Sequence, residues 1–440
     1  MEIFLFPFLF SIVTNLQVPI NIIPLNDNNP YRLLSSTVSS TSVFTNNTIY
    51  LMTIPLCFGE PKQCFNLMYD TFSHVTYVYN STMNMRIRHT YYITRSQTKE
   101  IEPNKNEPKK LNIDLSGNEI KDLISNFTNE KTIPNAQNMF TFYLINILTN
   151  SLYLPYDGVI GLSRFYDTDL VIDKHKRINA SNEVSIMEHL YKNKYINKKI
   201  FAHKIYKKYK QGVFYLGETG ISSKSNKVNY CISEPYTNKN CYFSYWQCRV
   251  SSFLTGNDLK INLINSTIIF NSGYYYVQIP QFYKDRVFLS LLGQEIFETC
   301  NEFSLDEDGM ALFCPELPKA KLPDIVFQII DGFNVTLKGD QLFMYTYYNK
   351  FDKNYWGYQS LITYNYFLQG TFIMGKIFME NYHMIFDYEN NKVGLIEIEE
   401  NEKMHNVNVI NSVLINVINI ECLLLIFGIG VILGNKCILK

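Results

Sequence analysis

The chain has 440 residues, and its 40 basic residues balance 40 acidic ones. Apolar residues make up 46 % and charged residues 18 %, a composition that excludes a disordered chain. A neutral chain without a basic block also argues against a nucleic-acid partner. Its length exceeds what one hydrophobic core supports, so two lobes are expected.

The first 17 residues predict a secretory signal peptide. An apolar core runs from Ile3 to Val13 and is too short to span a bilayer, although Glu2 takes the place of the usual positive charge. Asn-x-Ser/Thr sequons support a glycoprotein of the secretory pathway. These sequons begin at Asn46, Asn80, Asn126, Asn179, Asn265 and Asn334.

Seven cysteines precede the C-terminal apolar run, which agrees with an oxidising compartment. Cys57 and Cys64 flank a Gly-Glu-Pro turn and are expected to staple a hairpin. Cys300 and Cys314 bound a short polar loop and form the second expected pair. The other three leave one thiol over, and their pairing cannot be deduced from the sequence. They are Cys231, Cys241 and Cys248.

One weak pattern occurs twice along the chain. An apolar strand at 65–69 ends in Asp70-Thr71, and a second at 267–270 ends in Asn271-Ser272-Gly273. Each copy is followed at long and similar range by two apolar residues and a glycine, at 159–161 and 373–375. A repeat of this kind predicts a duplicated all-β lobe, with the boundary in the polar stretch near residue 235.

Further motifs lie around these copies in a fixed order. They are the Gly-x-Pro-x-Gln-x-Phe hairpin at 59–65, Tyr-Asp-Gly-Val-Ile-Gly-Leu at 156–162, the cysteine pair before 322–327, and Ile-Met-Gly…Phe…Tyr…Phe-Asp at 373–387. Their order and spacing resemble the pepsin family of aspartic proteases from about Thr48 to Ile398. The resemblance implies an all-β, bilobal fold with a central cleft, with lobes at 45–235 and 236–400.

The family's chemistry requires two carboxylates in contact, one from each lobe, that share a proton. The resemblance assigns Asp70 to the first catalytic position and Asn271 to the second, which is therefore degenerate. An amide does not titrate, and general acid–base assistance is worth ~10²–10⁴-fold. Arg32 is the sole basic residue between the signal peptide and the first strand, where family zymogens carry a basic prosegment.

Phe72 is the second departure from the family, because it replaces a glycine that lets the backbone approach the carboxylate. A ring is therefore expected beside Asp70. Thr71 and Ser272 are expected to hold the two loops together through their hydroxyl groups. The remaining residues expected to line the cleft are Ser73, Gly273 and Tyr274.

The C-terminal segment predicts a transmembrane helix at 413–434 with a short tail at 435–440. The 20 residues from Leu414 to Leu433 extend about 30 Å as a helix, enough to cross a bilayer. Glu421 is unfavourable in hydrocarbon but lies off centre. The terminal lysines fit the positive-inside rule and disfavour the alternative, a cleaved glycolipid-anchor signal.

Together these features predict a monomeric, single-pass protein of a secretory-pathway membrane, with a lumenal or extracellular ectodomain. Its function is expected to be that of a pseudoprotease that binds a peptide or protein in the cleft. Two alternatives stay open: an active endopeptidase with an atypical dyad, since Asn271-Ser272 is prone to deamidation, and a surface glycoprotein that displays loops such as 86–110. The histidines show no metal-ligand spacing, so neither a metal nor a cofactor is expected.

Overall fold

The structure is a computed structural model that describes most of the predicted lobes. The predicted anchor and tail, and all but two residues of the predicted signal peptide, lie outside it. Within the described part no helix is long and apolar enough to cross a membrane. The described residues are 16–24, 50–73, 75–80, 90–92, 95–97, 99, 109–110, 115–124, 139–148, 156–164, 185–206, 211–221, 227–233, 245–256, 259–305, 309–350, 353–365 and 370–399.

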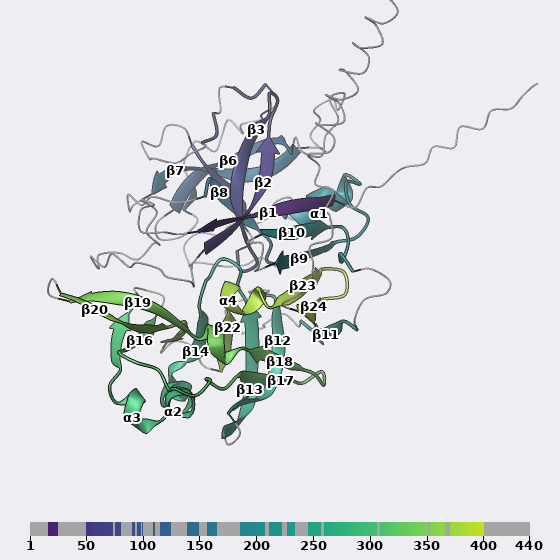
Figure 1. Cartoon of the computed structure of the whole chain (residues 1–440). Helices are drawn as coiled ribbons and strands as arrows, with labels where there is room; N and C mark the ends of the chain where they lie inside the picture. The colour runs from purple at the N-terminus through teal and green to yellow at the C-terminus, as the bar shows by residue number, and fades with distance from the viewer. Residues whose placement is uncertain are drawn as a thin grey trace, which may run out of the picture.

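The first of two sheets joins strands from both ends of the chain (Figure 1). In the described residues it has 13 strands, in the order β11-β24-β23-β9-β10-β1-β2-β3-β8-β4-β7-β6-β5. Their bounds are β1 Leu16–Pro24, β2 Tyr50–Phe58, β3 Gln63–Asp70, β4 Tyr77–Tyr79, β5 Lys109–Lys110, β6 Leu115–Leu123, β7 Met139–Leu148, β8 Gly158–Gly161, β9 Ile200–Tyr206, β10 Gln211–Leu216, β11 Asn229–Ile232, β23 Tyr382–Asp387 and β24 Lys392–Glu397.

The second sheet is built from the second half of the chain alone. Its 11 described strands follow the order β18-β17-β12-β13-β22-β14-β21-β16-β20-β19, with β15 paired to β16. Their bounds are β12 Gln247–Thr255, β13 Leu259–Phe270, β14 Val277–Pro280, β15 Asn301–Ser304, β16 Met310–Cys314, β17 Ile325–Ile329, β18 Asn334–Leu337, β19 Phe343–Lys350, β20 Lys353–Ser360, β21 Ile362–Asn365 and β22 Thr371–Met374.

The repeated sequence pattern forms a pair of equivalent strand contacts. β3 runs parallel to β8 with Asp70 opposite Gly161, and β13 runs parallel to β22 with Phe270 opposite Met374. This confirms the prediction of a duplicated β arrangement. The lobe limits at 45–235 and 236–400 stay a prediction. β1 precedes residue 45 and had no place in the expected first lobe, yet it pairs with β2 and β10.

Helices are short and few among the described residues, and one of them bears on the site. α4 (Lys376–Met379) begins immediately after β22 and Gly375, and all four of its residues are buried. The helix that follows Ser185 is α1, and the Ser185 side chain makes no capping hydrogen bond. The other helical elements are α1 Ile186–Lys192, η3 Gln281–Tyr283, α2 Lys284–Leu292, α3 Gln294–Phe297 and η5 Gly339–Gln341.

Three disulfides are present in the described part of the chain. Cys57–Cys64 joins register partners of β2 and β3, and Cys300–Cys314 closes the β15–β16 hairpin, so both predicted pairs are confirmed. The third bond joins Cys231 to Cys248. Because β11 belongs to the first sheet and β12 to the second, this bond ties the two sheets together.

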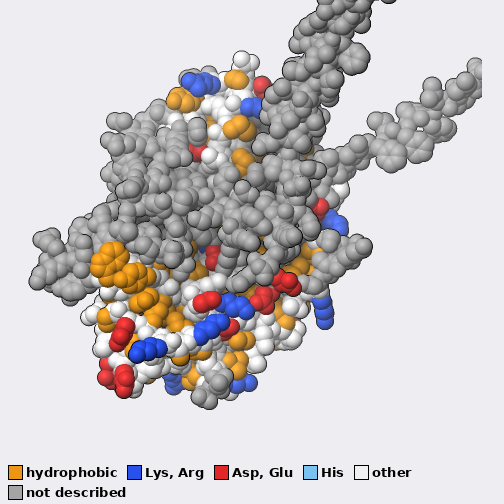
Figure 2. All heavy atoms as spheres, viewed as in Figure 1, with side chains coloured by type: hydrophobic (Ala, Val, Ile, Leu, Met, Phe, Trp, Pro, Cys, Tyr) orange, Lys and Arg blue, Asp and Glu red, His pale blue; other side chains and the backbone are white. Residues whose placement is uncertain are grey.

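The face drawn in Figure 2 combines an apolar area with mixed charges. Apolar side chains gather on the part of the face that carries the β19–β20 hairpin in Figure 1. Tyr345 and Trp356 of this hairpin are exposed and stack with ring centroids 5.6 Å apart. Lysine, arginine, aspartate and glutamate side chains are interspersed nearby, so neither sign of charge dominates the visible surface (Figure 2).

Three buried histidines predict that the fold loses stability in acid. Burial lowers the pKa of His203 to about 3, and the pKa values of His189 and His383 to about 4. Below the ordinary pKa of 6.5 the unfolded chain binds protons that the folded chain excludes, so stability falls as pH drops from 6.5 towards 3–4. Each histidine contributes up to about 1.4 kcal/mol per pH unit. Asp70, whose pKa is raised, acts in the opposite direction.

Thermal unfolding at pH 7.5 and at pH 4.5 measures this loss. We expect the thermal unfolding midpoint to be lower at pH 4.5 than at pH 7.5. In His203→Phe we expect a smaller difference between these two midpoints. That imidazole packs between the rings of Tyr69 and Phe386, and its two nitrogens have no hydrogen-bond partner among the described residues, so an apolar ring suits the position. Equal midpoints at the two pH values for the wild-type chain would contradict the prediction.

Candidate active site

Two equivalent loops follow β3 and β13 and carry the two predicted catalytic positions. The backbone N–H of Phe72 donates to Asp70 Oδ1 at 2.8 Å, and that of Gly273 donates to Asn271 Oδ1 at 2.9 Å. An amide oxygen thus fills the structural role of a carboxylate oxygen in the second loop. The loop conformation therefore does not require a second acid. Only acid–base chemistry by a pair of carboxyl groups requires it.

Thr71 and Ser272 bond the two loops to each other. The backbone N–H of Thr71 donates to Ser272 Oγ, and that of Ser272 donates to Thr71 Oγ1, both at 2.9 Å. Each hydroxyl then donates across to a strand of the opposite half, to Phe270 O at 2.8 Å and to Tyr69 O at 2.9 Å. Both side chains are fully buried, so this reciprocal network, expected from the sequence, fixes the two loops in contact.

Asp70 lies directly against the second loop. A Cβ atom at Gly273 would lie 2.9 Å from both Cγ and Oδ1 of Asp70, closer than real Cβ contacts, so this approach requires glycine. Desolvation raises the pKa of Asp70. The backbone N–H groups of Phe72, Ser73 and Gly273 and the positive charge of Lys376 oppose that rise.

The Phe72 ring crosses to the second half of the chain. It stacks on Tyr245 with centroids 4.1 Å apart and an interplanar angle of 9°. The glycine of the motif is retained in the second loop, where Asp70 lies against it, and is lost in the first loop.

The remaining predicted cleft residues make local contacts. Ser73 Oγ accepts from the backbone N–H of Val75 at 3.2 Å. The hydroxyl groups of Tyr274 and Thr363 lie 3.0 Å apart. The backbone oxygen of Tyr274 accepts from the N–H of Lys376 at 2.8 Å. The loop that carries Tyr274 is thereby held against α4.

Lys376 is a buried cation close to the two loops that was not predicted from the sequence. Only 1 % of its surface is exposed. Burial lowers its pKa to about 7, against the opposing effect of Asp70. A signal was present, since Lys376 directly follows the glycine of the second apolar-apolar-Gly motif, where the first copy has Leu162.

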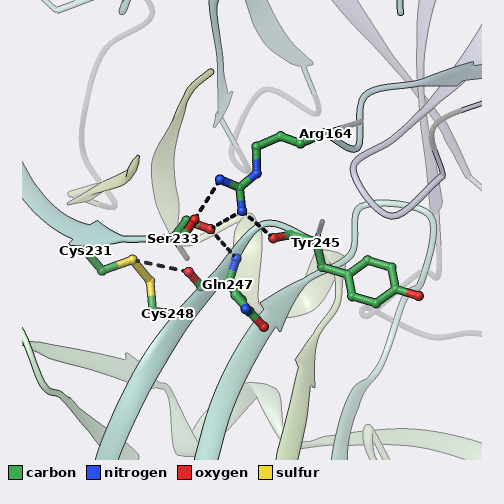
Figure 3. Close-up of a disulfide and its surroundings, with 6 residues drawn as sticks. All are labelled: Arg164, Cys231, Ser233, Tyr245, Gln247 and Cys248. Atoms are coloured by element: carbon green, nitrogen blue, oxygen red, sulfur yellow. Dashed lines mark hydrogen bonds between the residues drawn. A yellow bond between two sulfur atoms is a disulfide. The ribbon is translucent and has the colours of Figure 1, made fainter. Parts of the chain in front are cut away.

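Arg164 is a second residue that was not predicted, and its side chain points toward Ser233 and Tyr245 (Figure 3). Its guanidinium group donates to Ser233 O at 2.6 Å, Ser233 Oγ at 2.9 Å and Tyr245 O at 2.8 Å. It also donates to Asn391 Oδ1 at 3.0 Å and lies 4.6 Å from the ring centroid of Trp246. Leu162, two residues before Arg164 in the chain, donates its backbone N–H to Asp70 O. Arg164 is therefore close in the chain to a residue that contacts the loop of Asp70.

The described residues offer no cluster of metal ligands. They contain no group of three or more His, Cys, Asp or Glu side chains that could hold a metal ion.

Comparisons with known proteins agree with this geometry. The sequence model described as "Eukaryotic aspartyl protease" matches residues 50–398, which contain both loops. The chain is also similar to pepsin A of Gallus gallus, with 24 % identity over 249 residues. That alignment covers 55 % of this chain and 56 % of pepsin A, so it spans little more than half of either protein.

Proposed function

Because the chain belongs to the eukaryotic aspartyl protease family, we propose that it is a non-hydrolytic member that binds a peptide or protein segment in the cleft between its two lobes. The observation that carries this proposal is the amide of Asn271, held by Gly273 N–H at the second catalytic position. The site keeps the framework that presents two side chains to a ligand, while one of the two no longer titrates.

Hydrolysis needs a base that activates water and an acid that protonates the reacting carbonyl oxygen. Asp70 is able to act as one of these, but Asn271 is unable to supply or accept the second proton. The loss is on the order of 10²–10⁴-fold for general acid–base assistance alone. Phe72 also adds a ring where the family has a glycine, and this ring stacks on Tyr245.

Binding does not need the missing proton. Asp70 still offers acceptor oxygens and the amide of Asn271 offers donor hydrogens, which suit the polar groups of a peptide backbone. The bonds between Thr71 and Ser272 hold these two groups at a fixed separation before a ligand arrives. A preorganised pair of this kind favours binding because little entropy is lost when the ligand is bound.

We expect the purified ectodomain to cleave no member of a broad peptide library between pH 3 and pH 7, while pepstatin binds to it in calorimetry. Circular dichroism at each pH checks that the chain is folded, which matters because the buried histidines are expected to destabilise it in acid. Pepstatin-sensitive cleavage would refute the proposal. The matched control is Asp70→Asn, because cleavage that survives this change comes from a contaminant.

The proposed place of action is the lumenal or extracellular side of a secretory-pathway membrane, with a single-pass anchor at 413–434 and a monomeric ectodomain. Three disulfides and the apolar C-terminal run support it. Asn265 and Asn334 begin sequons and are both exposed, which supports their glycosylation. Resistance of the full chain to alkaline extraction from membranes tests the anchor.

A further inference from the structure

Lys376 is buried where the fold does not require a cation. Lysine is almost never fully buried unless its charge is compensated. Two backbone bonds fix its position, from Gly375 N–H to Tyr276 O at 3.1 Å and from Lys376 N–H to Tyr274 O at 2.8 Å. Met374, two residues earlier, accepts the N–H of Asn271 at 3.0 Å. Lys376 therefore begins α4 next to the loop of Asn271.

The first half of the chain provides an internal comparison. Leu162 takes the equivalent place after Gly161, is fully buried, and donates its backbone N–H to Asp70 O at 2.8 Å. The place after the glycine thus accepts a buried apolar side chain in the first half, although the backbone bonds differ, since Lys376 N–H donates to Tyr274 O and not to Asn271 O. Packing alone does not explain a lysine at position 376, so its charge needs a separate reason.

Asp70 and Lys376 both lie against the second loop, because the Asp70 carboxyl group lies against Gly273 and Lys376 N–H donates to Tyr274 O. Among the described residues Lys376 has no ion-pair partner within 4.0 Å, and Asp70 supplies the only charge that raises its pKa. β14 and β22, which pack against α4, carry no titratable side chain. The titratable groups elsewhere around α4 have no such effect on Lys376. They are Tyr274, Tyr275 and Tyr276 of the loop, Glu380 after the helix, and Tyr382, His383 and Asp387 of β23.

We propose that Lys376 is the charge partner of Asp70 and replaces the proton that a second carboxylic acid would share with it. The proposed cleft then has a floor with one carboxylate and one ammonium group, whose charges cancel. Such a floor favours an uncharged hydrogen-bonding group of the ligand, a peptide amide or a hydroxyl, over a charged one. Lys376 is a positioning residue, since it acts through Asp70. The ligand preference rests on the proposed function, whereas the charge pairing does not.

Carboxyl ¹³C NMR of the ectodomain tests the pairing without any ligand. The resonance of Asp70 is assigned by its loss in Asp70→Asn. We expect its titration midpoint to rise by one pH unit or more, a tenfold change in proton affinity, in Lys376→Met. The control is Lys338→Met, which removes a lysine of the same half that pairs with Glu397 at 2.8 Å, and which should leave the midpoint unchanged. An unchanged midpoint in Lys376→Met would overturn the proposal.

The reverse variant keeps the test decisive if Lys376→Met does not fold. In Asp70→Asn we expect the side-chain ¹³Cε resonance of Lys376 to titrate at least one pH unit lower than in the wild-type chain, because the only charge that favours its ammonium form is gone. An equal midpoint in the two chains would overturn the pairing. Both readouts report a proton equilibrium that a purely structural role of Lys376 would not move.

Pepstatin calorimetry between pH 5.5 and pH 8.5 tests the ligand preference. We expect wild-type affinity to weaken by tenfold or more above pH 7, because loss of the Lys376 proton leaves a carboxylate that is costly to strip of water. Lys376→Met should show no such step, and Lys338→Met should behave as the wild-type chain does. An identical loss of affinity above pH 7 in Lys376→Met would overturn the ligand preference. Absence of binding at every pH would overturn the proposed function and the ligand preference, while the NMR result would still decide the pairing.

Discussion

Replacing Phe72 by Gly and Asn271 by Asp in one chain is expected to leave peptidase activity near its starting level, whereas adding Lys376→Leu is expected to raise it by about 10²–10⁴-fold. The reason is the cation beside position 271. A new carboxylate at position 271 would pair with Lys376. This pairing would lower the pKa of the new carboxyl group and keep that group ionised. Two ionised carboxylates cannot share a proton, so the acid half of the reaction would still be missing.

Leucine is the chosen replacement because Leu162 already fills the equivalent place in the first half of the chain. Rates are measured on a mixture of fluorogenic peptides between pH 3 and pH 7, with folding checked at each pH. The matched control is the triple variant with Asp70→Asn, which should lose all of the gained activity. A double variant as active as the triple one would show that Lys376 does not block the dyad. An inactive triple variant would contradict the assignment of the two positions.

The main features of the fold could be predicted from the sequence because they depend on local patterns. An apolar strand that ends in a small polar residue, and a distant apolar-apolar-Gly, are each visible in a few residues, and their repetition indicated the pairs β3–β8 and β13–β22. β1 could not be predicted in this way. Its two prolines disfavour a strand, and its pairing with β10 joins residues as far as 200 positions apart, as Leu16 and Leu216 show.

The candidate site was predictable only in part, for a similar reason. Asp70 and Asn271 stand in motifs, and so do the hydroxyl groups of Thr71 and Ser272. Lys376 lies in no polar motif, and its burial depends on strands that precede it by about a hundred residues. Arg164 acts on a residue 227 positions away along the chain. A single cation in an apolar stretch carries no local sign of the groups that surround it after folding.

Arg164→Met is expected to destabilise the protein by about 3 kcal/mol or more. Arg164 is 4 % exposed, and its loss leaves the buried carbonyl oxygen of Ser233 and the partly buried one of Tyr245 without this donor, at ~1–3 kcal/mol for each buried group. Its contact with the Trp246 ring adds a smaller loss. These bonds join the segment after β8 to both sides of the connection between the halves, so we expect the two halves to lose their common unfolding transition.

Urea unfolding followed by tryptophan fluorescence measures the effect, since Trp246 lies at this junction and its Nε1 donates to Leu162 O at 2.8 Å. Arg249→Met is the matched control, because Arg249 is an exposed arginine of β12 whose loss should change stability by no more than about 0.5 kcal/mol. Arg164→Lys should lie between the two, since one ammonium group cannot reach all four acceptors of the guanidinium fork. If Arg164→Met and Arg249→Met unfold at the same urea concentration, the junction is held by the aromatic packing of Trp246 with Phe386 and by the Cys231–Cys248 bond instead.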